Sequence, residues 1–156
     1  MDVPRQEDWI GSLAGALGAI ALGLADAATE LRRANLIRTQ SLFMEQLDRA
    51  IDDPVLAAAL STLDGLDEER RRQLLFINRH YGLLLLTYQI GAIDRGELLG
   101  SLKILSRNRI FRHYWQATAD QRGDLPEHSL EARIGRALDA IVDERLDDLE
   151  EWWVVG

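Results

Sequence analysis

The segment from Trp9 to Ala25 constrains this chain most, because it contains no charged side chain. Its large apolar residues recur at steps of three and four, which places them along one side of a helix; they are Ile10, Leu13, Leu17, Ile20 and Leu24. As a helix the segment would be about 25 Å long, the short end of what crosses the hydrocarbon core of a bilayer. The segment therefore predicts either a membrane-spanning helix or a helix that pairs with another protein surface.

A second row of residues in this segment is small rather than large. Gly11, Gly15, Ala19 and Gly23 recur every four residues and lie along another side of the same helix. Small residues at this spacing let a second helix approach closely, and in lipid they form a common association surface. We call these four residues the small-residue ridge and expect them to be the helix-association surface of the chain.

Size and composition limit the possible functions. A chain of 156 residues is long enough for one domain with a real core, and its 47% apolar and 28% charged residues are typical of a globular protein. The net charge of −8 argues against a protein that neutralises nucleic-acid phosphates. The chain contains no cysteine, and its three histidines, His80, His113 and His128, are far apart in the sequence. No residues therefore have the spacing that is typical of metal ligands. We therefore expect no nucleic acid, no metal and no cofactor.

The periodicity is helical throughout, and no stretch alternates as a strand does. A long helix is predicted over about residues 8–50, and Asp53 followed by Pro54 indicates the start of the next one. Further helices are predicted over about residues 54–63, 67–93, 95–106, 108–121 and 127–152. The fold class is therefore all-α, a long N-terminal helix followed by a compact bundle of about five helices. We place the apolar N-terminal helix in residues 1–28 and the bundle domain in residues 29–156.

Five polar or aromatic side chains within apolar helices could line a ligand pocket; they are Asn78, His80, Tyr88, Arg112 and Trp115. No carboxylate or nucleophile at helical spacing completes a catalytic set with them, so we predict no catalytic residue. Basic and aromatic residues are interleaved from residue 107 to 115, a composition that can hold a nucleic-acid strand. At helical spacing, however, the aromatic and basic residues fall on different sides, which favours an ordinary amphipathic helix.

Four sequence stretches carry a resemblance to a known family. They are Asp53-Pro54-Val55-Leu56-Ala57, Glu69-Arg70-Arg71-Arg72-Gln73 leading to Asn78, Gly91-Ala92-Ile93-Asp94, and Arg109-Ile110-Phe111-Arg112-His113-Tyr114-Trp115. Over about residues 30–120 the chain resembles an uncharacterised family of small helical actinobacterial proteins, many with an apolar N-terminal segment ahead of the helical domain. The resemblance implies the helical fold and the N-terminal anchor, and it transfers no catalytic residue.

Together these features predict a non-enzymatic helical interaction protein that self-associates or holds a protein partner through its N-terminal helix. We expect membrane attachment with the main domain in the cytoplasm, because Arg32, Arg33 and Arg38 follow the apolar segment whereas only Arg5 precedes it. Residues 9–25 should then extend from the core and expose their large side chains. The alternatives are a soluble cytoplasmic protein with a helix–helix interface, and an enzyme or small-molecule-binding domain with a pocket near Asn78, His80 and Trp115.

Overall fold

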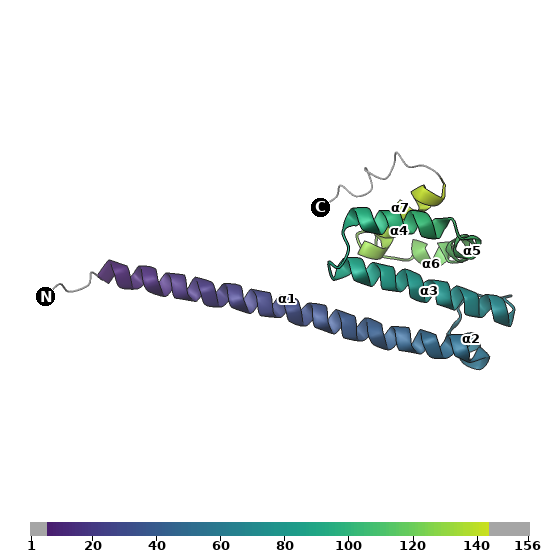
Figure 1. Cartoon of the computed structure of the whole chain (residues 1–156), viewed down its shortest axis with the longest axis horizontal. Helices are drawn as coiled ribbons and strands as arrows, with labels where there is room; N and C mark the ends of the chain where they lie inside the picture. Colours follow the sequence, from purple (N-terminus) through teal and green to yellow (C-terminus); the bar gives the residue numbers. More distant parts are fainter. Residues whose placement is uncertain (1–5, 144–156) are drawn as a thin grey trace. The chain divides into compact units, whose positions relative to one another are not determined.

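The computed structural model describes residues 6–143, with side chains described at residue 15 and from residue 17 onward. Seven helices occupy this range and no strand does (Figure 1): α1 (Gln6–Asp52), α2 (Pro54–Leu60), α3 (Glu68–Gln89), α4 (Arg95–Ser106), α5 (Arg109–Ala117), α6 (Ala119–Gly123) and α7 (Leu130–Val142). The predicted all-α class, with a long N-terminal helix before a compact bundle, is confirmed.

The chain divides into two compact units. The first, residues 1–40, contains the first part of α1, and the second, residues 41–156, contains the last part of α1 together with α2 to α7. Each unit is described by itself. The domain boundary expected after residue 28 stays a prediction.

Local capping explains where the helices of the second unit begin. The Oδ1 of Asp53 accepts a hydrogen bond from the Val55 amide at 2.8 Å, ahead of a helix whose first residue is Pro54. Asp94 and Glu97 form a reciprocal capping box at the start of α4. These helices therefore start as predicted, whereas α2 ends at Leu60, earlier than the predicted residue 63.

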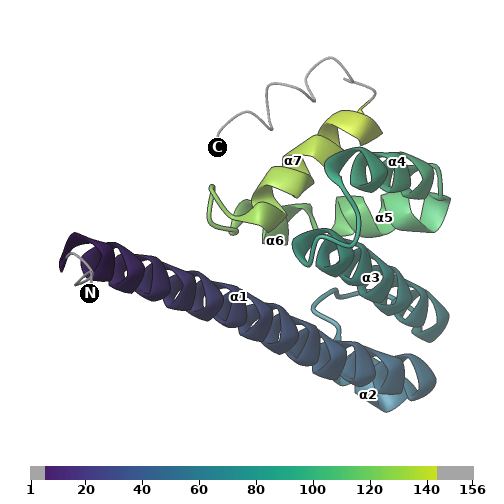
Figure 2. The same ribbon diagram turned by 60° about the vertical axis from the view of Figure 1, so that its left-hand side comes forward.

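The main core lies around α3, which packs against α2, α4 and α5, while α4 also packs against α5 and α7 (Figure 2). Its most completely buried large side chains come from α4, α5 and α7; they are Leu98, Leu102, Phe111, Ile134 and Leu138. These residues recur at helical spacing within each helix, so each helix turns one apolar side inward. The core is therefore assembled from the apolar sides of amphipathic helices.

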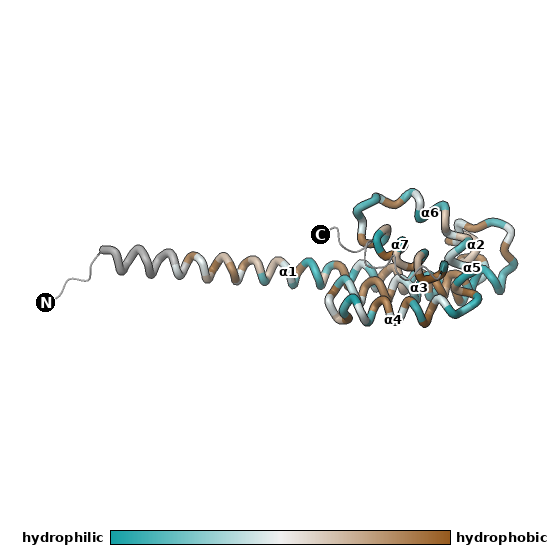
Figure 3. The backbone as a smooth tube through the Cα atoms, turned by 90° about the horizontal axis from the view of Figure 1, so that it is seen from above, coloured by the Kyte–Doolittle hydropathy of each residue, from teal (hydrophilic) through white to brown (hydrophobic). Residues whose placement is uncertain are grey.

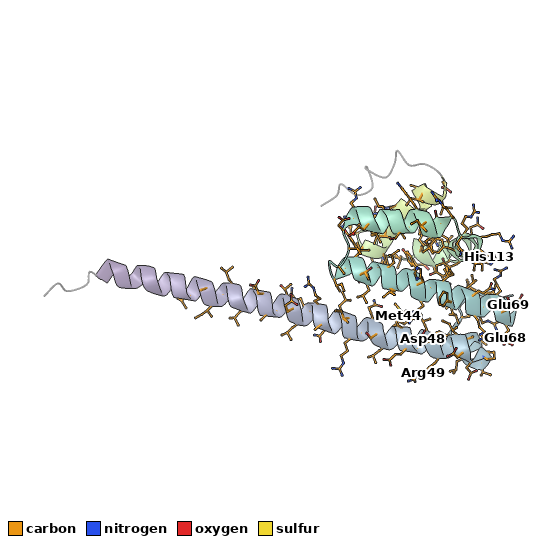
Figure 4. The ribbon with its side chains drawn as sticks, in the orientation of Figure 1. Met44, Asp48, Arg49, Glu68, Glu69 and His113 are labelled. Carbon is orange, nitrogen blue, oxygen red and sulfur yellow. The ribbon has the colours of Figure 1, made fainter. Side chains whose placement is uncertain are left out.

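A smaller cluster joins the last part of α1 to the bundle. Met44, Leu47 and Ala50 of α1 are buried together with Ala57 of α2 and Leu75 of α3. An ion pair reinforces this junction, since the Arg79 Nε lies 2.6 Å from the Asp48 Oδ1. Figure 4 places Met44 and Asp48 on the part of α1 that runs beside α3. The end of α1 is thus an integral part of the bundle.

The structure corrects three further predicted helix boundaries. The helix expected over residues 108–121 is two helices, because α5 ends before Thr118, whose hydroxyl donates to the Tyr114 carbonyl at 2.9 Å. Helix α3 ends at Gln89 rather than near residue 93, and the left-handed Gly91 (φ 73°) follows. Helix α7 begins after the N-cap Ser129 instead of at residue 127. The remainder of that predicted helix, up to residue 152, lies outside the described residues.

Candidate functional site

The first part of α1 exposes large apolar side chains; four of them lie along one side, and Leu22, 70% exposed, lies on another. Leu17, Ile20, Leu24 and Leu31 are 65%, 59%, 66% and 65% exposed, and we call these four residues the apolar face of α1. Figure 3 shows hydrophobic positions recurring along this part of the helix. Exposure of Leu17, Ile20 and Leu24 agrees with the prediction, whereas Ile10 and Leu13 lie outside the described side chains. Contiguous apolar exposure of this kind marks interaction surfaces in folded proteins.

The small-residue ridge is also exposed where its residues are described. A Cβ atom built on Gly15 or Gly23 would meet nothing within 4 Å, and Ala19 is exposed. Gly11 lies outside the described side chains. Glycine lowers helix stability relative to alanine, and no contact within the described chain requires it at Gly15 or Gly23. The role of the ridge in helix association stays a prediction.

Charged residues follow the uncharged segment of α1. Asp26, Glu30, Arg32 and Arg33 are all exposed, and the Arg33 guanidinium lies 3.2 Å from the Glu30 carboxylate. Within the part of the chain that the structure describes, no helix combines the length and the apolar character needed to cross a membrane. The uncharged segment of α1 therefore ends before Asp26, the first of these charged residues.

The five residues predicted to bind a ligand occupy different environments. His80 and Arg112 are exposed, Asn78 and Tyr88 are half-buried, and Trp115 is buried in the main core. Asn78 lines a cavity of about 260 Å³ together with Tyr114. Trp115 instead belongs to a hydrogen-bonded network with α6 and α7. Ligand binding by the five residues as a set stays a prediction.

The cavity beside Asn78 combines apolar walls with neutral polar groups and one charged group, the Arg71 guanidinium. Leu47 and Leu74 contribute apolar surface, and the Gln121 amide donates to the Thr62 hydroxyl at 2.8 Å on another side. The Tyr114 hydroxyl donates to the Asn78 Oδ1 at 2.8 Å. Burial raises the pKa of Tyr114 to about 12, because the charged phenolate is poorly solvated there. At neutral pH Tyr114 therefore acts as a hydrogen-bond donor to Asn78.

Two residues that sequence reasoning missed hold the Trp115 indole. The Arg122 Nη1 donates to the Trp115 carbonyl at 2.5 Å, and the Trp115 Nε1 donates to the Asp139 Oδ1 at 2.6 Å. Burial lowers the pKa of Arg122, and the nearby Asp139 carboxylate partly opposes this shift. Asp139 lies 24 residues after Trp115 on a different helix, and the break between α5 and α6 separates Trp115 from Arg122, so spacing along one helix did not associate the three residues. Their arrangement clamps an aromatic ring between three helices.

A larger cavity of about 610 Å³ lies where the end of α1, the first half of α3 and the start of α5 meet. Its apolar lining comes from Ile51, Phe76, Ile77 and Ile110, while Glu68 and Glu69 are among its polar lining residues. Figure 4 shows these two glutamates at the N-terminal end of α3. Sequence reasoning missed this cavity because each of the three helices supplies only part of its wall.

Comparison with known proteins identifies the family of the chain and nothing narrower. No curated protein and no solved structure matches it. A family of unknown function, DUF6082, matches residues 11–152, a range that includes most of α1 and every later helix. The resemblance to an uncharacterised family is thereby confirmed and extended toward both ends of the chain. The chain belongs to the DUF6082 family of unknown function.

Proposed function

We propose that this chain is a non-enzymatic interaction protein that self-associates, two copies pairing through the apolar face of α1. The observation that supports the proposal is the exposure of Leu17, Ile20, Leu24 and Leu31, each about 60% or more. An apolar side chain of this size stabilises an association by about 1.5–3 kcal/mol when it is fully removed from water. A second copy of the same helix supplies a surface of the same chemistry to cover them.

The spacing of these residues suits helix pairing. Leu17, Ile20, Leu24 and Leu31, with Ala27 between the last two, follow the alternating steps of three and four that define a coiled-coil seam. Ala21 and Ala28 neighbour the seam on the helix surface, and their small side chains let the two backbones approach. Pairing along this seam would bury the apolar face over about 22 Å of helix.

The decisive experiment compares the full chain with the double variant Ile20→Glu/Leu24→Glu by sedimentation velocity over a range of concentrations. The expected result is a concentration-dependent dimer for the unmodified chain and a monomer for the variant, because four carboxylates would face one another in the seam. The matched control, Val55→Glu/Ile104→Glu, replaces two exposed apolar residues outside the first unit and should leave the dimer intact. An unmodified chain that stays monomeric at high concentration would disprove the proposal.

The contribution of the small-residue ridge needs separate variants. The ridge lies along another side of α1 than the apolar face, so Gly15→Leu/Gly23→Leu adds bulk outside the proposed seam and weakens association only if a second helix also packs on the ridge. The control Gly15→Ala/Gly23→Ala keeps small side chains and should leave the association nearly unchanged. Equal dimer strength in all three proteins would assign association to the apolar face alone and exclude the ridge.

Membrane attachment of the same segment, with the main domain in the cytoplasm, is the expectation from the sequence, and it stays a prediction. It is tested by fractionating cells that express the full chain or a chain lacking residues 1–28. Recovery of the full chain in the high-speed supernatant without detergent would exclude membrane spanning. If the full chain is recovered in the membrane pellet and released by detergent, while the truncated chain is not in the pellet, then lipid, and not a second copy, covers the apolar face.

A second candidate function is small-molecule binding near Asn78, and the cavity that Asn78 and Tyr114 line supports it. Its neutral hydrogen-bonding groups and the Arg71 guanidinium favour a ligand that has an apolar portion and a polar group able to accept hydrogen bonds. A fragment screen by NMR would test this, with Asn78→Leu as the variant that removes the amide. Shift changes at Asn78 and Tyr114 that disappear in the variant would support ligand binding, and an unresponsive cavity would exclude it for the fragments screened.

A further inference from the structure

We propose that the cavity at the junction of α1, α3 and α5 binds an amphiphilic organic monocation, a single ammonium group carried on an apolar body. This site is separate from the apolar face of α1, and the inference does not depend on self-association. It rests on three observations: the size and apolar walls of the cavity, the exposure of Phe76, and the excess of carboxylates over cations at its edge.

The walls suit the apolar body of such a ligand. Ile51, Ile77 and Ile110 come from three different helices, and the cavity volume of about 610 Å³ lies within the ordinary range of small-molecule sites. Phe76 also lines the cavity and is 54% exposed, although neighbouring Ile77 on the same helix is 7% exposed. A ligand with an aliphatic or aromatic body would cover the part of the Phe76 ring that the described residues leave exposed.

The charges at the cavity favour a cation. Glu68 and Glu69 are both exposed, and Arg72 is the basic residue among the lining side chains. The Arg72 Nε donates to the Ile51 carbonyl at 2.5 Å, and its Nη1 lies 3.9 Å from the Glu68 carboxylate. One guanidinium, already engaged, therefore faces two carboxylates. The remaining negative charge attracts an ammonium group and repels an anion.

The other polar groups at the site do not recruit an anion. The Asn108 side-chain oxygen accepts hydrogen bonds from the Ile110 and Phe111 amides at 2.8 and 3.2 Å, so it caps the start of α5. The Gln73 amide donates to the Glu69 carboxylate at 3.1 Å, and its oxygen accepts from the Nη1 of Arg70, which does not line the cavity, at 3.0 Å. The face of the Phe76 ring adds a further attraction for a cation, since aromatic faces bind ammonium groups.

The test is calorimetric titration of the full chain with decyltrimethylammonium, with decyl sulfate as the anion of equal chain length, both below their micelle concentrations. The cation should bind saturably with one site per chain, and at least about tenfold more tightly than the anion. Phe76→Ala should weaken cation binding about fivefold, and Glu69→Gln about two- to fivefold, because each removes one attractive contact. Both residues are at the surface, so these variants keep the fold.

Two control variants separate this site from non-specific adsorption. Ile104→Ala removes a side chain on α4 that is 71% exposed, and Glu45→Gln removes an exposed carboxylate on α1. Neither residue lines the cavity, and neither variant should change the affinity. Equal binding of the two surfactants, unchanged affinity in both Phe76→Ala and Glu69→Gln, or no saturable binding of the cation would each overturn the proposal.

Discussion

The Cζ atom of the Arg122 guanidinium lies 3.5 Å from the centroid of the Trp115 ring. On other sides the indole meets Phe111, with ring planes 14° apart, and Tyr81, edge-on with centroids 5.5 Å apart. The Asp139 carboxylate accepts the indole N–H, so α5, α6 and α7 meet at this one side chain. The short helix α6 is therefore held by the cation and carbonyl contacts of Arg122 and not by a buried residue of its own.

Replacing Arg122 by lysine should destabilise the bundle by about 1–3 kcal/mol. Lysine keeps the positive charge but loses the planar stacking on Trp115, and it lacks the Nη1 that donates to both the Trp115 carbonyl and the Thr118 hydroxyl. The measurement is urea unfolding followed by tryptophan fluorescence. Arg112→Lys, on an exposed residue, is the control and should change stability by no more than about 0.5 kcal/mol. Matching midpoints for the two variants would contradict the clamp.

Tyr114→Phe should cost about 1–2 kcal/mol of stability, because it leaves the half-buried Asn78 oxygen without its hydroxyl donor. The double variant Tyr114→Phe/Asn78→Leu should lose less than the sum of the two single losses. A double-mutant cycle measures this coupling, which we expect to be about 1 kcal/mol. Strict additivity would mean that the 2.8 Å contact contributes nothing to folding.

Stability should fall in alkaline solution. Burial raises the pKa of Tyr114 to about 12 and the pKa of Tyr81 as well, whereas both phenols titrate near 10 in the unfolded chain. Above pH 10 the unfolded state therefore binds fewer protons than the folded state, and each further rise in pH favours unfolding. The loss should be absent below about pH 9 and should grow between pH 10 and 12, to the order of 2 kcal/mol for Tyr114 alone. The measurement is the midpoint of urea unfolding at a series of pH values from 9 to 12. If the Tyr114→Phe variant loses stability with rising pH as steeply as the unmodified chain does, Tyr114 is not the cause of the alkaline destabilisation.

Gly18→Ala and Gly23→Ala should each stabilise α1 by up to about 1 kcal/mol, since a Cβ meets nothing within 4 Å at either position. Circular dichroism at 222 nm during thermal unfolding would detect the gain. The informative control is Gly65→Ala, where the space is equally open but the backbone has a φ of 72°. There the added Cβ is strained, so that variant should destabilise the protein. Identical effects at all three positions would refute this account of the glycines.

Much of the helical order could be predicted from the sequence because capping is a local interaction. Asp53, Asp94 and Asn108 each accept hydrogen bonds from amides two or three residues ahead, so the sequence alone identifies the helices that they begin. Apolar spacing is equally local: Leu98 and Leu102 of α4, and Ile134 and Leu138 of α7, recur at steps of four and are buried. The end of α5 was missed because Thr118 bonds back to Tyr114 and is also held by Arg122, a side chain whose position depends on the packing of Trp115.

The sequence by itself determined the all-α class, the length of α1 and the uncharged character of residues 9–25, since each follows from residue type and spacing along one helix. Tertiary structure alone decided that Asn78 meets Tyr114 while His80 and Arg112 face outward. It also decided that Ile51, Phe76 and Ile110 enclose one cavity. The physical reason is that periodicity specifies which side of a helix is buried, whereas the neighbour across the interface depends on how separate helices cross and in what register.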